Sequence, residues 1–512
     1  MSENSCREEC AKLLDLASQM QTVLDLSLDP KAHDVLNEWT KHANSLLSSP
    51  SLETLDGEQA LENLSLDLRH RWLNQSHKQS SHYMMSPPHQ QRTALPGGLP
   101  MVYPYDRWLK PTQLEQKLDH QRPPPEGWTS KTCVFASGMA AITTFLQVYR
   151  AFSLDYWPRS KNTASLHWFG GYFEVRTALE VICGHEMKGR KHVDQAGLND
   201  AVATGGADIV LIEPVASNLD LDVFDMDTFS QAWQQRSTDQ PGIIVLDTSL
   251  SGDIFPLEQL CQKLTLSPVD LVVNIRSGLK MDQYGLEFSN LGLMSLWTKD
   301  DKRNQAALDS FTKTLKKIRT TFGVGLSESE CSALAAPFIL DDTALKTHSL
   351  SVFKNNRRLA ISLNQAIKKQ DSLFIQASHP SKGGNQHLPW AEAPYINLRY
   401  RSQDASNRLF LKFVIDFEAI RRKLSLRSGS SFGFRSHRFE MGFVRGAKYS
   451  SLRIAMGSRA GPSCEGIIDL FKELAAYPDF KALRAAYPDI VKRLPNTDDD
   501  SPKQDEHSNK PR

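Results

Sequence analysis

A lysine at the end of an apolar run has the clearest capacity for chemistry in this sequence. The run begins at Val269 and continues through Val273 and Ile275 to Lys280. An ammonium that emerges from a buried strand loses hydration, so its pKa falls and the free amine becomes available as a nucleophile. Lys280 is therefore the candidate for a lysine that forms a Schiff base. The structural alternative is an ordinary solvated strand end.

An aspartate follows a second apolar run, upstream of the lysine. Asp247 ends the stretch Gly242-Ile-Ile-Val-Leu246. A carboxylate there could pair with the protonated ring nitrogen of pyridoxal phosphate and keep the ring an electron sink. Lys280 and Asp247 are thus the first pair to test, and the order of the remaining motifs decides whether they act together.

Two short stretches of small residues could hold such a cofactor. Ala136-Ser-Gly-Met-Ala140 joins a predicted strand to a predicted helix, and free backbone N–H groups beside a serine hydroxyl form a good phosphate cradle. Phe169-Gly-Gly171 follows the next strand and offers an aromatic face for a flat ring. Each has a structural alternative, because small residues also permit tight helix packing and aromatic rings at strand ends are often core.

The middle of the chain must position these residues, and there short apolar runs alternate with helical stretches. Continuously apolar strands separated by helices predict a parallel sheet covered on both faces. In such sheets ligands bind beyond the carboxyl ends of the strands. The sequence therefore predicts an α/β fold with a mostly parallel central sheet. The predicted strands are 132–136, 164–168, 208–212, 242–246 and 270–275.

Composition changes along the chain predict its division into domains. Apolar stripes at helical spacing mark the N-terminal part, a Ser-, His-, Gln- and Pro-rich stretch follows, and the C-terminal tail is charged and almost without apolar residues. In the second domain we predict strands at 395–400, 408–415 and 450–456. The predicted parts are a helical extension (1–75), a linker and arm contacting a neighbouring subunit (76–125), a large domain (126–297), a smaller α+β domain (298–494) and a disordered tail (495–512).

Composition and charge exclude several classes of protein. The 512 residues allow two or three domains, and a net charge of +1 gives no electrostatic reason to expect nucleic acid or an anionic membrane as partner. Seven scattered cysteines without a Cys-x-x-Cys pattern argue against a disulfide scaffold and a zinc ribbon, so we expect no metal. No apolar run could span a bilayer and the N-terminus lacks a signal-peptide pattern, so we expect a cytoplasmic protein.

The motifs also occur in an order that resembles a known family. They are Tyr105-Asp-Arg107, Ser137-Gly-Met139, Phe169-Gly-Gly171, Glu213 to Asn218, Asp247-Thr-Ser249, Ser277-Gly-Leu-Lys280, Ser431-Phe-Gly433 and Leu452-Arg-Ile-Ala-Met-Gly457. Together they resemble the pyridoxal-phosphate enzymes of cysteine and methionine metabolism: cystathionine γ-synthase, cystathionine γ-lyase and methionine γ-lyase. The resemblance implies fold type I, related to aspartate aminotransferase, with pyridoxal 5′-phosphate as cofactor and active sites shared within a homodimer or homotetramer.

The resemblance implies a role for each matching residue. Lys280 would form the Schiff base and shuttle protons, and Asp247 would pair with the pyridine nitrogen. The phosphate would be bound by Ser137, Gly138, Met139 and Ser277, joined by Tyr105 and Arg107 from a neighbouring subunit. Phe169 would stack on the cofactor ring, and Asn218 would lie close to the ring hydroxyl. Arg453 would bind the substrate carboxylate, with Ser431 nearby.

Several positions depart from the family's pattern. Phe169 replaces the family's stacking tyrosine, which keeps the stack but removes a phenol that can serve in acid–base chemistry. Leu279 and Met281 replace the threonine before the lysine and the tyrosine after it, and Asn218 lies one residue further from Glu213 than in the family. These departures indicate a divergent member.

The resemblance implies chemistry at the γ-carbon of a small L-amino acid, by γ-elimination or γ-replacement through a vinylglycine-type intermediate. The reaction would belong to a specialised pathway, such as halide elimination from a chlorinated allylglycine to an alkyne amino acid, or to transsulfuration-like chemistry. A β-lyase of the same family and a catalytically silent structural or regulatory member remain the alternatives.

Overall fold

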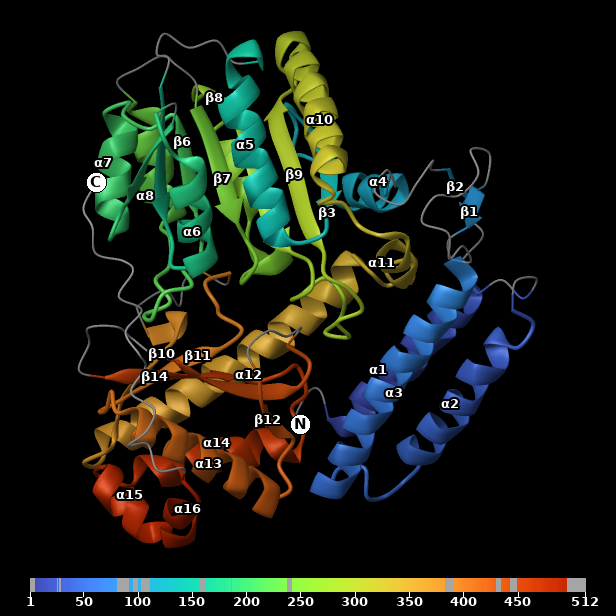
Figure 1. Ribbon diagram of the computed structural model, residues 1–512, viewed down its shortest axis with the longest axis vertical. Helices are drawn as coiled ribbons and strands as arrows, with labels where there is room; N and C mark the ends of the chain where they lie inside the picture. Colours follow the sequence, from blue (N-terminus) through green and yellow to red (C-terminus); the bar gives the residue numbers. More distant parts are fainter. Residues whose placement is uncertain are drawn as a thin grey trace.

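The chain forms a large sheet domain, a smaller domain beside it and a group of three N-terminal helices (Figure 1). The computed structural model describes residues 5–24, 26, 29–80, 92–94, 100–102, 111–156, 163–185, 187–236, 242–382, 388, 390–429, 434–442 and 449–494. None of the described helices combines the length and the apolar composition of a membrane-crossing segment.

The large sheet has seven strands in the order β3-β9-β8-β7-β6-β4-β5. Neighbouring strands from β8 to β5 are parallel, whereas β9 is antiparallel to both β8 and β3. The predicted α/β fold with a mostly parallel sheet is confirmed. The strands are β3 (Trp128–Phe135), β4 (Ala164–Phe169), β5 (Met187–Lys191), β6 (Ile209–Ile212), β7 (Gly242–Asp247), β8 (Val269–Ser277) and β9 (Gly292–Lys299).

Both faces of this sheet are buried, as continuously apolar strands require. Along β7, Ile243 and Val245 belong to one core and Ile244 and Leu246 to the other. The first core is covered by α5 (Gly138–Tyr156), α6 (Phe173–Ile182) and α10 (Lys302–Phe322). The second is covered by α7 (Gln195–Ala203), α8 (Met226–Gln234) and α9 (Leu257–Lys263).

Two strands of the large sheet were not predicted. β5 has the sequence Met-Lys-Gly-Arg-Lys and lies at the sheet edge with four exposed residues, so it carries no apolar signal. β9 is almost fully buried between β3 and β8. Its direction reverses that of β8, so the segment after Lys280 returns into the same sheet instead of crossing to another layer.

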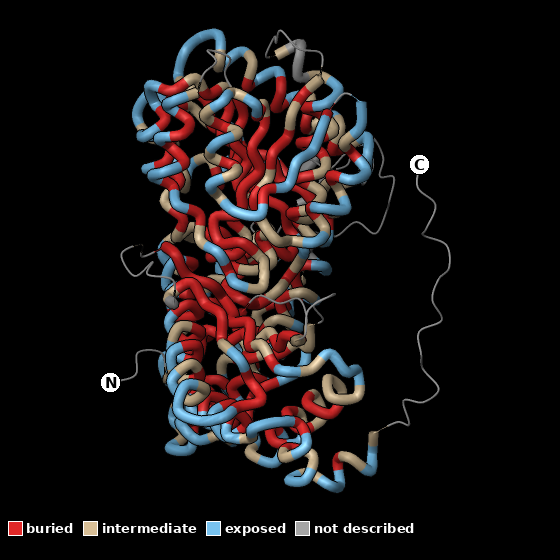
Figure 2. Tube along the Cα trace, turned by 90° about the vertical axis from the view of Figure 1, so that its left-hand side faces the viewer, coloured by how far each residue is buried: buried red, intermediate tan, exposed pale blue. Residues whose placement is uncertain are grey.

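The smaller domain contains a five-stranded sheet in the order β10-β11-β14-β13-β12. The strands are β10 (Phe374–Ser378), β11 (Ile396–Tyr400), β12 (Leu426–Ser428), β13 (His437–Gly442) and β14 (Ser450–Ala455). The helices of this part are α12 (Asp342–Lys368), α13 (Ala405–Arg421), α14 (Pro462–Ala475), α15 (Phe480–Ala486) and α16 (Pro488–Arg493). Buried segments fill the interior of both domains (Figure 2).

The strand predicted at 408–415 is wrong, because these residues lie in α13. The Asp404 side chain caps this helix by accepting a hydrogen bond of 2.8 Å from the Ser406 N–H. Leu411, Val414 and Ile415 are buried and share one face at helical spacing. A short apolar run fits both periods, and the cap upstream of it decides for helix.

The N-terminal helices are α1 (Cys6–Thr22), α2 (Ala32–Leu47) and α3 (Leu55–Ser80), followed by the hairpin strands β1 (Arg92–Ala94) and β2 (Pro100–Val102) and the helix α4 (Thr112–Gln121). The three helices share an apolar core with α11 (Glu328–Ala333) and with residues that follow Lys280. The helix α3 ends at Ser80, past the boundary predicted at residue 75. α10 packs on the large sheet, so the large domain also extends beyond 297. The predicted tail, 495–512, lies outside the described residues.

A backbone contact at Gly292 fixes the start of β9 against the start of α5. A Cβ atom on Gly292 would lie 2.0 Å from the carbonyl oxygen of Ser137 and 3.0 Å from the Gly138 nitrogen. No side chain could move aside to relieve this clash, because the neighbouring atoms are backbone. The segment before α5 can therefore approach β9 only where β9 has no side chain.

We predict that Gly292→Ala destabilises the fold by about 3 kcal/mol, because the clash with Ser137 must displace backbone. Urea unfolding followed by circular dichroism measures this free energy. Gly184→Ala is the matched control, since a Cβ there meets nothing within 4 Å. The control should change the free energy of unfolding by less than about 0.5 kcal/mol. Equal effects of the two substitutions would contradict the backbone contact.

Candidate active site

The residues predicted to act together lie beyond the carboxyl ends of β7 and β8. Asp247 is the last residue of β7 and pairs in register with Ile275 of β8, which places it at the same sheet edge as Ser277 and Lys280. A cavity of about 200 Å³ opens there. Among the predicted site residues, it is lined by Ser137, Gly138, Met139, Asp247, Ser277 and Lys280.

The Lys280 side chain is half-buried and borders this cavity. Its Nζ lies 5.6 Å from the centroid of the Tyr172 ring. Burial lowers the pKa of Lys280, the negative charge of Asp247 opposes this shift, and the positive charge of Arg453 adds to it. The amine is thus more readily deprotonated than that of an exposed lysine, as nucleophilic and general-base roles require.

The N-terminus of α5 and two further serines lie together on one side of the cavity. The Ser137 hydroxyl accepts a hydrogen bond of 3.0 Å from the Ala140 N–H, and the Ser249 hydroxyl accepts one of 2.8 Å from the Ser277 N–H. A Cβ on Gly138 would lie 3.2 Å from the Ser277 nitrogen, so glycine permits the close approach of the two segments. Backbone N–H groups at a helix N-terminus favour a bound phosphate.

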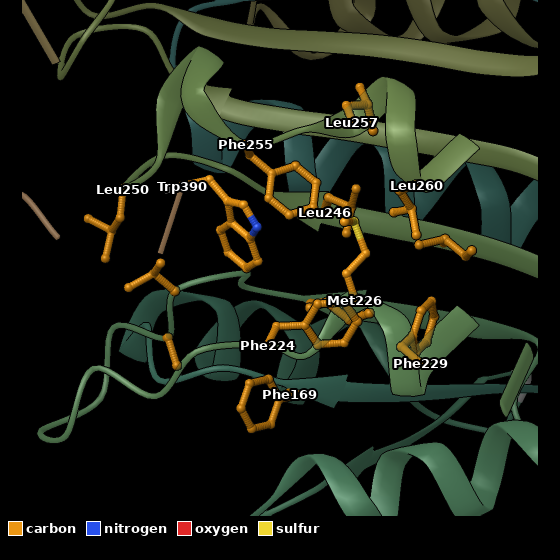
Figure 3. Close-up of a cluster of buried hydrophobic side chains, with 14 of the residues drawn as sticks. Phe169, Phe224, Met226, Phe229, Leu246, Leu250, Phe255, Leu257, Leu260 and Trp390 are labelled. Atoms are coloured by element: carbon orange, nitrogen blue, oxygen red, sulfur yellow. The ribbon is translucent and has the colours of Figure 1, made fainter. Parts of the chain in front are cut away.

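The aromatic ring at the cavity belongs to Tyr172, which corrects the expectation for Phe169. Phe169 is 4% exposed and packs in the core of the large domain, where Figure 3 shows it near Phe224 and Met226. Phe169 is the last residue of β4, and its ring belongs to the core covered by α7, α8 and α9. Two glycines separate it from Tyr172, which lines both this cavity and the adjoining one.

The phenol of Tyr172 is held by a neighbouring carboxylate. Its hydroxyl donates a hydrogen bond of 2.8 Å to Glu174. Burial and this hydrogen bond raise the pKa of Tyr172, so the phenol keeps its proton at neutral pH. The site therefore contains a phenol of the kind that the sequence, read through Phe169, had seemed to lack.

Glu213 is a buried carboxylate of the site that was not predicted as a site residue. It follows β6 and accepts hydrogen bonds from the backbone N–H groups of Gly171 (3.1 Å), Tyr172 (2.9 Å) and Ser217 (2.6 Å). Burial and the nearby charge of Asp247 raise its pKa, while these hydrogen bonds oppose the shift. An acidic residue directly after a buried strand is the signal that identified Asp247, and it also applies to Glu213.

Asn218 does not reach the cavity, which corrects its predicted role beside a cofactor ring. Its side-chain amide donates a hydrogen bond of 2.7 Å to Asp222 and accepts one of 3.2 Å from the Asp222 N–H. These bonds hold the side chain within its own loop. Ser217, four residues after Glu213, lines both cavities instead.

A second cavity, of about 430 Å³, adjoins the first and reaches the smaller domain. The two cavities share Tyr172, Glu174, Ser217, Leu250 and Lys280. Arg453 of β14 lines the second cavity together with Tyr395, Phe434 and Glu440. Large and small domain thus both contribute to one composite site.

The charge of Arg453 is balanced within this second cavity. Its guanidinium forms an ion pair with Glu440 of β13 and lies 5.3 Å from the centroid of the Tyr395 ring. The Arg453 and Glu440 side chains retain 29% and 37% of their exposure, so both remain accessible from the cavity. Burial raises the pKa of Tyr395 to about 12, an effect that the charge of Arg453 opposes.

Three predicted site residues lie outside the described residues: Tyr105, Arg107 and Ser431. Their roles stay predictions from the sequence.

Comparison with solved structures identifies proteins that share the fold of this chain. No family model and no curated protein matches this sequence. Two solved structures of CalE6 from Micromonospora echinospora are similar, one described as an apo methionine γ-lyase and the other as a cystathionine γ-lyase. Each has a TM-score of 0.52 and 18% sequence identity, and the alignment covers 77% of this chain and 92% or 93% of the other. The chain therefore has the fold of these proteins, which confirms the predicted fold class.

We predict that the Lys280 amine is half deprotonated below pH 10.4, the ordinary lysine value, because burial disfavours its charge. The chain is first treated with hydroxylamine to remove any carbonyl compound from the lysine. Competitive labelling with trace acetic anhydride at a series of pH values then measures this midpoint, with mass spectrometry as the readout. Exposed Lys188 is the internal reference. Asp247→Asn should move the Lys280 midpoint to still lower pH, since the opposing negative charge is lost. A common midpoint for Lys280 and Lys188 would contradict the argument.

Proposed function

We propose that this protein is a pyridoxal-phosphate-dependent enzyme acting at the γ-carbon of a small L-amino acid, by γ-elimination or γ-replacement. The observation that carries the proposal is the placement of Lys280 and Asp247 at one edge of the sheet, in a cavity that the N-terminus of α5 borders. The fold shared with a structure described as a methionine γ-lyase supports the reaction class.

The residues at the first cavity suit pyridoxal phosphate. The α5 N-terminus with Ser137, Ser249 and Ser277 would bind the phosphate, and Gly138 allows the Ser277 segment to lie close to that helix terminus. Asp247 would pair with the ring nitrogen, and Tyr172 would supply the aromatic face that had been assigned to Phe169. When bound, the cofactor supplies an electron sink that stabilises negative charge at the substrate's α-carbon.

The chain's own groups would move the protons. Lys280, with its lowered pKa, is the base for the α-proton of the substrate and carries protons between neighbouring carbons. Tyr172 keeps its phenolic proton beside the same cavity, and its hydrogen bond to Glu174 orients the hydroxyl. Glu213, bonded to the N–H groups of Gly171 and Tyr172, fixes the segment that presents the ring.

Arg453 would bind the substrate carboxylate as a bidentate partner. In the described structure its guanidinium is paired with Glu440, so a substrate carboxylate must compete with this side chain. The competition makes Glu440 part of the substrate-binding step, and it disfavours ligands without a carboxylate because they offer nothing in exchange for the existing ion pair.

The reaction within this class depends on the leaving group. A γ-eliminating enzyme releases a 2-oxobutyrate-type product, whereas a β-lyase releases pyruvate. A screen should therefore pair γ-substituted with β-substituted amino acids, and it should include a chlorinated allylglycine with halide release as the readout. Tyr105 and Arg107 would complete the phosphate site from a neighbouring subunit, which makes a homodimer or homotetramer the proposed active form.

We predict that the purified chain incubated with pyridoxal phosphate and desalted retains an absorption band near the visible edge, and that Lys280→Ala loses it. The lysine is the nucleophile that attaches the cofactor, so its removal abolishes covalent retention. Lys188→Ala, at an exposed position on β5, is the matched control and should keep the band. If the parent chain retains no band, the protein is a binding or structural protein and the catalytic proposal fails.

We predict opposite effects on KM at the Arg453–Glu440 pair. Arg453→Lys should raise KM for an amino-acid substrate by about tenfold to hundredfold, because lysine cannot replace a bidentate guanidinium. Glu440→Gln should lower KM several-fold, because the substrate carboxylate no longer competes with a charged partner. Steady-state kinetics on the substrate found in the screen tests both. An increase of KM in Glu440→Gln would show that Glu440 binds substrate itself.

A further inference from the structure

The turn that bears Lys280 and the segment after it form a closed loop, residues 278–291, which we call the lysine loop. Its two ends meet in a hydrogen bond of 2.7 Å from the Gly278 N–H to the Leu291 carbonyl. Inside it, the amide of Gln283 donates to the carbonyls of Gly278 (3.1 Å) and Ser289 (2.6 Å). Gln283 is fully buried, so these bonds are shielded from water. A displacement of the outer part of the loop is therefore transmitted to the turn that bears Lys280.

The N-terminal helices hold the lysine loop from outside. Arg69 of α3 donates two hydrogen bonds, of 3.0 and 2.7 Å, to the carbonyl of Glu287. The Arg435 guanidinium donates one of 3.0 Å to the carbonyl of Tyr284 and also pairs with Glu9 of α1. Glu9 and Arg435 are both about 5% exposed, so each charge depends on the other.

Apolar contacts reinforce these polar ones. Leu286, Phe288 and Leu291 of the lysine loop belong to the core that the N-terminal helices share with α4, α11, β3 and β9. The Phe288 ring lies 6.4 Å from the ring of Trp72 on α3. These side chains are thus packed against the extension, and the Phe288 ring also lies 6.1 Å from that of Phe338 beyond the loop.

The backbone at the anchored positions is in a disfavoured conformation. Tyr284, Glu287 and Phe434 have φ angles of 56°, 52° and 58°, in the left-handed region that side-chain-bearing residues rarely adopt. Such residues persist only where the surrounding structure holds them. At Tyr284 and Glu287 the carbonyl oxygen itself accepts the hydrogen bonds from Arg435 and Arg69.

Phe434 connects the same helices to the second cavity. It lines that cavity beside Arg453, and the next two residues in sequence are Arg435 and Ser436. Ser436 donates a hydrogen bond to Glu62 of α3, and Glu62 also pairs with Arg459 at 2.9 Å. Carboxylates of α1 and α3 therefore fix the wall of the substrate cavity that Phe434 forms.

We propose that the N-terminal extension is a positioning element of the active site, in which Arg69 and Glu9 hold the lysine loop and Glu9 and Glu62 hold the Phe434 wall. The consequence for catalysis rests on the proposed function, but the positioning itself is a property of the chain without cofactor. Arg69 and Glu9 act through the loop and touch neither cavity, so they are positioning residues and not catalytic ones.

The test compares Arg69→Met with Arg71→Met in the full chain. Each protein is first treated with hydroxylamine to remove any bound carbonyl compound. Arg71 lies two residues further along α3 and pairs with Glu38 and Asp67 inside the extension, so its substitution removes a half-buried arginine without touching the lysine loop. Glu9→Gln is the second variant. Hydrogen exchange followed by mass spectrometry reports on residues 281–291, and trace acetic anhydride reports the pH midpoint of Lys280.

We expect amides in 281–291 to exchange about tenfold faster in Arg69→Met and Glu9→Gln than in the parent. The Lys280 midpoint should move up toward the ordinary lysine value, because a loosened loop admits water to the amine. Arg71→Met should leave both readouts at parent values. If Arg69→Met and Arg71→Met behave alike, or if exchange rises equally throughout the chain, the positioning role is overturned. Neither readout uses pyridoxal phosphate, so a missing absorption band tests the proposed function separately.

Discussion

Charges gathered at one edge of a buried sheet set the main constraint on this structure. Glu213 follows β6, Asp247 ends β7 and Lys280 lies just beyond β8, and these three strands are adjacent and parallel. Burying an isolated charge costs several kcal/mol, so the buried Glu213 depends on the backbone N–H groups around it, while Asp247 and Lys280 are half-buried and carry opposite charges. Burial lowers the pKa of Lys280 and raises that of Glu213, and the charge of Asp247 opposes the first shift and adds to the second.

Much of this edge could be predicted from the sequence, because the chemistry stands directly after apolar runs. Lys280, Asp247 and Ser137 were found in this way, and all three line the cavity. The aromatic ring was placed three residues too early, since β4 extends through Phe169 and turns that ring into the core, and only the two following glycines bring the chain round to Tyr172. The strand predicted at 408–415 was wrong for a different reason. A short apolar run fits the helical and the strand period equally, and the capping residue Asp404, which favours a helix, was not considered.

What the sequence could not give are contacts between distant segments. Arg435 and Glu9 are 426 residues apart, and Arg69 and Glu287 are separated by 218. Neither pair leaves a local pattern, because each residue alone resembles an ordinary surface charge on a helix or in a loop. Glu440 was missed in the same way, since its importance arises only when β13 and β14 pair and bring it to Arg453. The helical extension, to which the sequence assigned no chemistry, therefore contacts the lysine loop only because the fold brings the two together.

The separation between the extension and its partners also determines when the site can form. During synthesis the helices with Glu9, Glu58 and Glu62 are made before the large sheet, whereas Arg435 and Arg459 are made after it. Until then these three carboxylates, which are buried in the finished protein, lack the two arginines that pair with them, so water must solvate them. Contacts of such high sequence separation form slowly. A ribosome-bound chain can thus form the large sheet, with Lys280 at its edge, before Arg435 and the Phe434 wall are made, so the extension docks after the sheet has formed.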